Sequence, residues 1–276
     1  MSKLLNANFA RLKKEKVFWI TVVFMVIYAA GVCIWAYSRG SGIKFDGLFL
    51  YVYGLGGQAA VPGIVMAVLC SMFIGTEYSD GTVRNKLVVG RTRFEIYASN
   101  FITCAAAGIF LNVVCAASIC AVGIPLFGGF AMPAGMLIQI IITGVLIMVS
   151  YAALFNMLAM LLTNKTTSSV LSLILAIAVM FAAAYMIARL AEPEITDLYS
   201  LVDGQFTVET GPNPFYIGGM ARVICQVFVN LFPSGQSLQL STEYAELNWT
   251  LPLYSAGVII AANAAGLCGF IRKDLK

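Results

Sequence analysis

The chain contains a run of 69 residues, from Ile96 to Asn164, without a single charged side chain. One bilayer crossing needs about 20 apolar residues, so this run is long enough for two crossings and a turn. Glycines and prolines around Gly128 and Pro133 mark the turn. The rest of the chain has the same character, because 60% of all residues are hydrophobic and 11% are charged, against about 25% charged in ordinary globular proteins. The sequence therefore predicts a polytopic helical membrane protein.

Six uncharged apolar segments are long enough to cross a bilayer. Lipid offers the backbone no hydrogen-bonding partners, so each crossing must form a helix. Pro62 lies within the second segment, where it either kinks the helix or marks a place that meets protein and not lipid. The fold class we expect is all-α, with one transmembrane domain over residues 1–276. The predicted spans are Val17–Tyr37, Gly54–Ile74, Ile96–Ile124, Ala134–Thr163, Thr166–Ala188 and Trp249–Ile271.

The basic residues are unevenly distributed between the connecting segments. With both termini on one side, 13 of the 17 Lys and Arg residues fall on that side. Lys and Arg are retained on the cytoplasmic side of a membrane. The asymmetry predicts a multi-pass protein of the cell membrane with both termini cytoplasmic. The four basic residues left outside are Arg39, Lys44, Arg189 and Arg222.

The first 16 residues form a basic stretch ahead of the first span. Leu5, Phe9 and Leu12 fall on one helical stripe, with the basic residues elsewhere. This pattern predicts an amphipathic helix on the inner membrane surface. The alternative is a basic membrane anchor without a further function.

The sequence lacks the residues of several common functional sites. It has no histidine, so His-based metal sites and His general bases are absent. Its seven cysteines include no Cys-x-x-Cys pair and are typical of small buried apolar residues. No Gly-x-x-x-x-Gly-Lys-Ser/Thr phosphate loop is present. We therefore expect no catalytic residues, no metal site and no cofactor in this chain.

The predicted spans contain amide side chains but no carboxylates, lysines or arginines. Ion-coupled carriers usually hold ionisable groups within the membrane. The absence of such groups from the spans therefore argues against a secondary transporter. The amides either form hydrogen bonds between helices or line a translocation path. The candidates are Asn100, Asn112, Gln139, Asn156 and Asn263.

Small residues recur every four positions in the last span, at Gly257, Ala261, Ala265 and Gly269. Such a stripe allows two membrane helices to approach closely. It predicts a helix contact and says nothing about function.

The loop between the second and third spans, residues 75–95, has the signals of a short helix. Ser79 or Asp80 can cap its start, and Gly90 can end it. Thr92 and Glu95 then match a capping box that opens the third span.

Within this loop Val83 and Leu87 lie one turn apart on an apolar stripe. A short amphipathic helix across the inner ends of two spans suits docking into a groove on a cytoplasmic partner. A solvated loop with ordinary anchoring charges is the alternative.

The same loop resembles the permease subunits of type 2 ABC transporters. In that family the pattern Glu-x-x-x-Gly-Thr-hydrophobic-Arg follows the second of six spans, and Glu77, Gly81, Thr82 and Arg84 match it position by position. The matching sequence continues over residues 73–78, 81–87, 90–93 and 96–97. The resemblance implies a coupling helix that contacts an ATPase through Glu77, Gly81, Thr82, Val83, Arg84, Lys86 and Leu87.

The resemblance also implies partners and a class of cargo. Two ABC ATP-binding subunits per complex would carry ATP and Mg, and a second permease, identical or related, would complete the path in the bilayer. The layout is most similar to bacterial antibiotic-peptide immunity and bacitracin-resistance permeases, which implies an exporter of a peptide, lipid or other hydrophobic compound. No nucleic-acid partner is expected.

The segment from Arg189 to Asn248 is the only large piece predicted outside the membrane. Its first part is acidic and rich in Gly and Pro, so we expect irregular structure there. Phe215–Phe232 predicts a helix with Arg222, Gln226 and Asn230 on a polar face, which suits an interfacial or half-inserted helix. The resemblance implies re-entrant extracellular helices at this place.

Two other classes of function stay open at this point. One is a membrane-embedded enzyme acting on lipid or peptide, with Glu77, Asp80 and Glu95 as its polar candidates. The other is a passive channel or an interaction scaffold.

Overall fold

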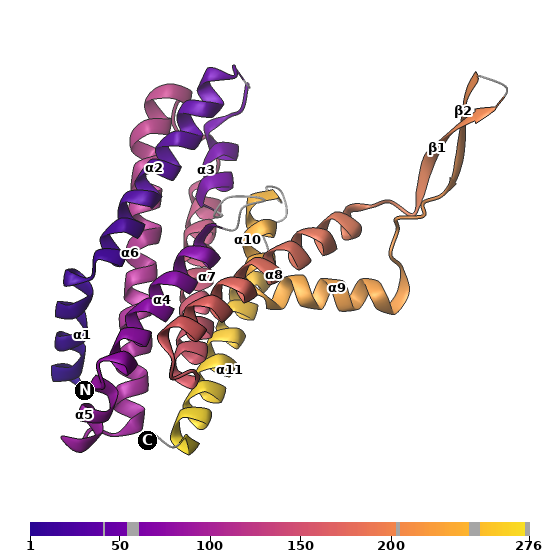
Figure 1. The fold of residues 1–276 in the computed structure, drawn as a ribbon. Helices are drawn as coiled ribbons and strands as arrows, with labels where there is room; N and C mark the ends of the chain where they lie inside the picture. The colour runs from indigo at the N-terminus through magenta and orange to yellow at the C-terminus, as the bar shows by residue number, and fades with distance from the viewer. Residues whose placement is uncertain (41, 54–60, 203–204, 243–248, 274–276) are drawn as a thin grey trace.

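The computed structural model describes residues 1–40, 42–53, 61–202, 205–242 and 249–273. Within these residues the protein is almost entirely helical (Figure 1), which confirms the predicted all-α fold class. Six described helices are long and apolar enough to cross a membrane, as the sequence predicts. They are α2 (Lys16–Ser38), α4 (Val61–Ser79), α6 (Arg93–Phe127), α7 (Ala134–Leu161), α8 (Lys165–Ala191) and α11 (Thr250–Arg272).

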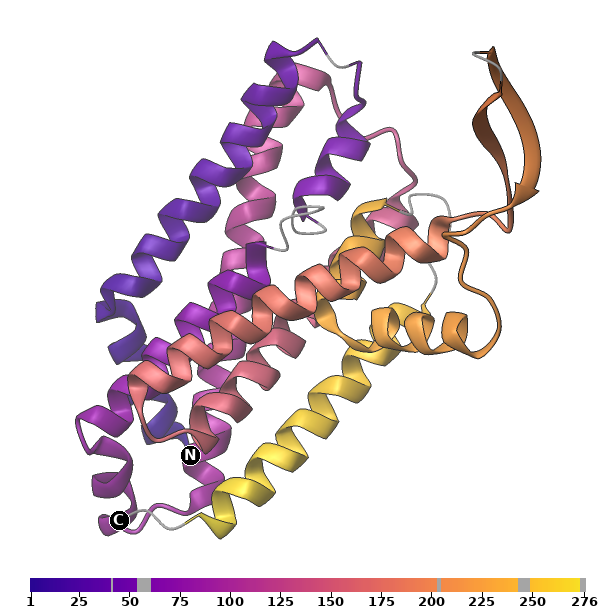
Figure 2. The same ribbon diagram turned by 45° about the vertical axis from the view of Figure 1, so that its right-hand side comes forward.

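The shorter elements gather at the two ends of this bundle. At one end lie α1 and α5 together with the carboxyl end of α11 (Figure 1). At the opposite end of α8 a two-stranded hairpin projects away from the helices, and α9 and α10 follow it (Figures 1 and 2). These elements are α1 (Ser2–Lys14), α3 (Phe45–Tyr53), α5 (Thr82–Val88), β1 (Ile195–Val202), β2 (Gln205–Pro212), α9 (Gly219–Leu231) and α10 (Pro233–Thr242).

The second predicted span differs from the structure. Helix α4 begins at Val61 and runs to Ser79, beyond the predicted end at Ile74. The start of the predicted span Gly54–Ile74, residues 54–60, lies outside the described residues. Pro62 stands in the first turn of α4, where a missing N–H is no loss, and not in a helix interior. The kink is therefore not found in α4, whereas Pro62 is buried against protein, which was the other possibility.

The first part of the outer segment is a β-hairpin, so the expectation of irregular structure was wrong. β1 and β2 pair antiparallel, with Ile195 opposite Pro212 and Val202 opposite Gln205. Phe206 and Val208 alternate with polar residues in the sequence, which is the period of a strand. The gain from pairing two such strands outweighs the local turn signals.

Helix α9 begins at Gly219, four residues after the predicted start at Phe215. The Asn213 side chain accepts a hydrogen bond from the Phe215 N–H at 2.8 Å. This side-chain turn competes with helical hydrogen bonding and delays the helix. α10 follows directly, with Pro233 at its first position.

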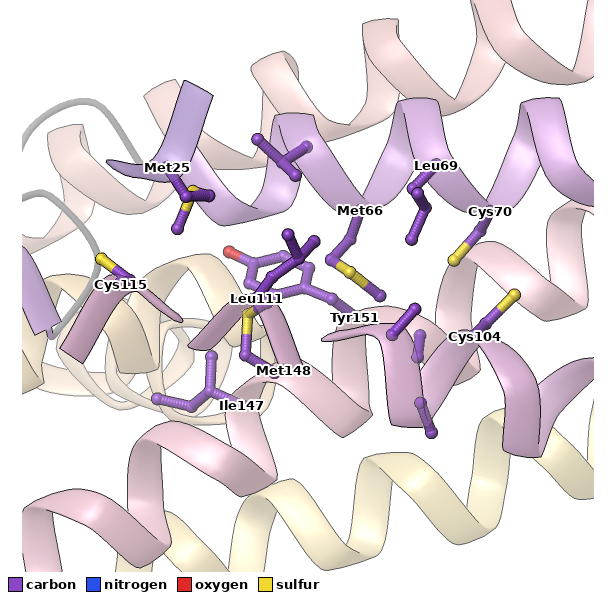
Figure 3. Packing of buried hydrophobic residues seen from close by; sticks show 14 of the residues in the cluster. Met25, Met66, Leu69, Cys70, Cys104, Leu111, Cys115, Ile147, Met148 and Tyr151 are labelled. Atoms are coloured by element: carbon purple, nitrogen blue, oxygen red, sulfur yellow. The ribbon is translucent and has the colours of Figure 1, made fainter. Parts of the chain in front are cut away.

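Helix α4 occupies the centre of the bundle. In the most apolar 18 residues of α4, 72% of the residues are buried inside the protein, against 22% in the corresponding part of α8. α4 packs against α7 and α8, α7 against α6 and α11, and α2 against α6. Met66 of α4, Leu111 of α6 and Met148 of α7 meet in the core (Figure 3). The least hydrophobic span is the most enclosed because its surface meets protein and not lipid.

The small-residue stripe of α11 does not mediate the packing of this helix in the chain. Gly257, Ala261 and Ala265 are exposed, and Gly269 contacts Leu161. α11 packs on α7 with a different face. A contact of the stripe with a helix outside this chain stays a prediction. The buried residues of α11 are Leu251, Pro252, Ser255, Val258, Ala262, Gly266 and Phe270.

Two cations hold helix ends together at the end of the bundle that carries α5. Arg93 donates hydrogen bonds to the carbonyl oxygens of Phe270 (2.6 Å) and Ile271 (3.1 Å) at the end of α11. Lys273 donates to Leu161 O at the end of α7 (2.6 Å), and its partial burial lowers the pKa of its ammonium group. Cations at helix carboxyl ends satisfy free carbonyls and the helix dipole.

We expect Gly75→Ala to destabilise the protein. A Cβ at Gly75 would lie 3.0 Å from both Cα and Cβ of Lys165, so α4 and α8 would have to separate. Overpacking of this kind costs about 1–3 kcal/mol. The measurement is thermal unfolding in detergent, with Gly31→Ala as control, since a Cβ at Gly31 meets nothing within 4 Å. Equal midpoints for the two variants would contradict the close approach.

Candidate functional site

Residues 75–95 connect α4 to α6 through a short helix, as the sequence predicts. This helix is α5, which covers Thr82–Val88. α6 then begins with the predicted capping box: the Glu95 N–H donates to Thr92 Oγ1 at 3.2 Å, and the Thr92 N–H donates to the Glu95 carboxylate at 3.4 Å. Both the helix and its neighbouring cap are therefore confirmed.

The start of α5 is made by a glycine and not by the predicted Ser79 or Asp80. α4 runs on to Ser79, whose hydroxyl donates to the carbonyl of Gly75. The chain then turns at Gly81, which has a φ of +66° and is the N-cap of α5. Gly90, with a φ of +84°, ends the segment as predicted. Left-handed backbone at both positions favours glycine.

Glu77, near the end of α4, is the centre of the site. Its side chain is 0% exposed and pairs with two cations, Arg11 of α1 at 2.5 Å and Lys86 of α5. The amide of Asn100 in α6 donates to the other carboxylate oxygen at 2.9 Å. A carboxylate withdrawn from water is stable only with such partners. One buried side chain therefore joins four helices.

A second layer of polar contacts surrounds this carboxylate. Asn8 of α1 donates to Asn100 Oδ1 at 2.7 Å and accepts from Lys86 at 3.2 Å. Arg11 also lies over the ring of Phe73, 3.8 Å from its centre, and donates to the Phe73 carbonyl at 3.2 Å. We call Asn8, Arg11, Glu77, Lys86 and Asn100 the Glu77 network.

The N-terminal helix is present, but its buried stripe differs from the predicted one. Leu4, Asn8 and Leu12 are buried, whereas Leu5 and Phe9 are half-buried. α1 packs against α6. The helix is rotated so that Asn8 reaches Asn100, because the hydrogen bonds made there offset the cost of burying an amide.

The faces of α5 decide which side chains a partner can reach. Val83 is 2% exposed and Leu87 is half-buried against the core, so the predicted apolar stripe faces the protein's own bundle. The outward face carries Arg84 and Asn85, followed by Val88 and Val89, which are 80% and 78% exposed. Val88 and Val89 therefore form a small exposed apolar surface at the end of this helix.

The other motif residues are divided between these two surfaces. Thr82 faces inward, and its hydroxyl donates to the Glu77 carbonyl at 3.0 Å. Lys86 also points inward, to Glu77 and Asn8. Arg84 is exposed and forms no ion pair with the described residues.

The amides proposed for a path do not gather at one place. Asn100 belongs to the Glu77 network, and Asn112 accepts from the Tyr53 hydroxyl at 2.9 Å. Gln139 and Asn156 are buried at different levels of α7, and Asn263 donates to a carbonyl of its own helix. Asn112 lines a mostly apolar cavity of about 340 Å³ together with Tyr53. A path-lining role for the five amides stays a prediction.

Sequence reasoning missed Asn8 and Arg11 as members of the site. One signal was present, because Asn8 lies four residues from both Leu4 and Leu12 and so interrupts an otherwise apolar stripe. A polar residue in such a stripe indicates a polar partner on the helix against which it packs. That partner could not be identified, since Asn100 is 92 residues away.

The comparison with protein families gives one match. A family model described as ABC-2 family transporter protein matches residues 4–183, which is more than half of the chain. The matched range runs from α1 into α8 and contains the whole Glu77 network. No curated protein matches the chain.

Proposed function

The chain belongs to the ABC-2 family of transporter membrane proteins, and on this basis we propose that it is the permease subunit of an ATP-driven exporter. Membership makes it a transport component and implies an ATP-binding partner and a lipid environment. We propose that residues 1–276 act as one transmembrane domain. Two such domains, identical or related, would enclose the path, with two ATP-binding subunits that carry ATP and Mg beneath them.

The observation that carries this proposal is the attachment of α5 to the bundle. α5 has an outward face, formed by Arg84, Asn85 and Val88 and continued by Val89. Its inward face is tied to α4, α6 and α1 through Glu77. A partner that moves α5 must therefore also move these helices. ATP binding to the partner would shift the population between two arrangements of the spans.

The proposed orientation places α1 and α5 in the cytoplasm. Both lie at the end of the bundle that carries most of the basic residues, and the carboxyl end of α11 lies there too (Figure 1). Positive residues are retained in the cytoplasm. The β1–β2 hairpin, α9 and α10 would then lie on the extracellular side.

Cysteine labelling tests this orientation. We expect a membrane-impermeant maleimide to label Asp197→Cys in intact cells and to label Asn85→Cys only after permeabilisation. Both positions are exposed, and the native cysteines would be replaced first. Labelling of position 85 in intact cells would reverse the orientation.

The direction and cargo follow from the sequence resemblance alone. The sequence also resembles bacterial permeases for antibiotic-peptide immunity and bacitracin resistance, a weaker resemblance than the one to the family. We therefore propose export of an amphiphilic peptide, a lipid-linked molecule or another hydrophobic compound from a bacterial cell. The enzyme alternative is not favoured, since Glu77 is engaged by two cations and Glu95 caps α6.

Copurification and reconstitution test the proposed function. We expect the chain to purify with an ATP-binding subunit in a ratio of two to two, and ATP to drive cargo movement only when both are in the same liposome. The control is a partner unable to hydrolyse ATP. Transport by the chain without any ATPase would refute the exporter and support a passive channel.

A further inference from the structure

A cavity lined by both polar and apolar side chains lies where α8, α9 and α10 meet. Its volume is about 460 Å³, within the range of small-molecule sites. The three helices pack against one another (Figure 2). The lining from α8 is apolar, the lining from α9 is mostly polar, and α10 contributes one amide. The lining residues are Ile187, Leu190, Ala191, Arg222, Gln226, Val229, Asn230 and Gln239.

Helix α9 is oriented with its polar face toward this cavity. Arg222, Gln226 and Asn230 recur every four residues and all line it. The opposite face is apolar and exposed, with Met220 75%, Ile224 60% and Val227 50% exposed. An amphipathic helix with its apolar face outward suits contact with hydrocarbon. The cavity therefore lies between a lipid-facing helix and the bundle.

The charge of the cavity comes from Arg222. Its guanidinium donates to Leu190 O at 2.9 Å and, more weakly, to Ile217 O at 3.4 Å, which fixes it against the end of α8. The lining contains no carboxylate, and no ion pair joins Arg222 to a carboxylate among the described residues. A guanidinium in a partly dry site favours a phosphate or carboxylate, to which it donates paired hydrogen bonds.

We propose that this cavity binds the anionic head group of an amphiphile, a phosphate or a carboxylate. Arg222 pairs with the charge, Gln226 and Asn230 supply further hydrogen bonds, and the apolar part of the ligand lies along Ile187 and Leu190. The view of this ligand as cargo at the outer side rests on the proposed function. The binding itself depends only on the cavity.

The test uses the purified chain in neutral detergent with dodecyl phosphate as the probe. Binding is measured as the saturable rise in the midpoint of thermal unfolding. Dodecanol and inorganic phosphate are titrated separately. Dodecanol measures the contribution of the alkyl chain of the probe, and inorganic phosphate measures that of the free anion. We expect dodecyl phosphate to bind at least tenfold more tightly than either.

Three variants locate the site. Arg222→Gln is expected to weaken dodecyl phosphate binding at least tenfold. Ala191→Phe fills the cavity without touching the contacts of Arg222, so it should have the same effect if the first variant fails to fold. Arg189→Gln is the matched control, because Arg189 is on the same side of the molecule but does not line the cavity; its binding should equal that of the wild type.

Equal binding by all four proteins would overturn the proposal, and so would equal binding of dodecanol or inorganic phosphate. This experiment needs no ATPase. Failed binding with intact ATP-driven transport would remove this inference alone. Failed transport with intact binding would remove the exporter and leave the cavity as an anionic-amphiphile site.

Discussion

Replacement of Glu77 by Ala is expected to detach α5 and α1 from the bundle. The substitution leaves Arg11 and Lys86 without their carboxylate, and Asn100 without an acceptor. Removing one partner of a buried ion pair costs about 3–5 kcal/mol. The cost here is expected toward the lower end, because the side chains of Arg11 and Lys86 remain 26% and 16% exposed. ATP-dependent transport should be lost.

Two readouts separate detachment of α5 from general unfolding. A cysteine at Val83, which is 2% exposed in the folded chain, should react slowly with a soluble maleimide and become reactive when Glu77 is Ala. The midpoint of thermal unfolding should fall in parallel. Asp80→Asn is the matched control, since Asp80 is exposed and has no ion pair with the described residues. Unchanged labelling at position 83 would show that Glu77 does not hold α5.

A double substitution, Val88→Asp with Val89→Asp, is expected to abolish association with the ATP-binding subunit. The two side chains are 80% and 78% exposed, so the folded chain should keep its stability to within about 0.5 kcal/mol. In a complex, the two carboxylates would lose water without gaining a partner, which costs several kcal/mol. Since each 1.4 kcal/mol is about tenfold in affinity, a loss of at least tenfold should be measurable by copurification or titration.

Val83→Asp is the contrasting variant, since it is expected to lower the stability of the chain itself and not only its association with the ATP-binding subunit. Val83 is packed into the core, so a carboxylate there should lower the amount of folded protein before any partner is added. If the Val88 and Val89 variant keeps full association, the outward face of α5 is not the coupling surface. If Val83→Asp folds normally but loses association, the inward stripe is that surface, and the arrangement of α5 differs in the complex.

These predictions rest on features that the sequence indicated to different degrees. The motif around Glu77 could be located from sequence because glycines at 81 and 90 and the capping box at Thr92 are local signals. Which face of α5 points away from the bundle could not be predicted from the sequence. Its seven residues make about two turns, and an apolar stripe on so short a helix is equally compatible with an inward and an outward face.

The outer segment and the last span also combine features that could be predicted from the sequence with features that could not. Gly and Pro near residues 204 and 211 indicate turns, but the strands between them become stable only when they pair with each other. The stripe of small residues in α11 permits a close helix contact, yet α7 packs on another face. In both cases a local pattern allowed several structures, and a contact elsewhere selected one.

The sequence by itself determined that this is a multi-pass membrane protein and where most of the six described helices that are long and apolar enough to cross a membrane lie. The physical reason is that hydrocarbon thickness and the need to satisfy the backbone depend on composition within about 20 residues. The tertiary structure alone decided which faces are buried and which polar groups meet. Glu77 reaches Arg11 across 66 residues, and Asn8 reaches Asn100 across 92. The energy of such pairs exists only when both partners are packed together, so no local pattern contains it.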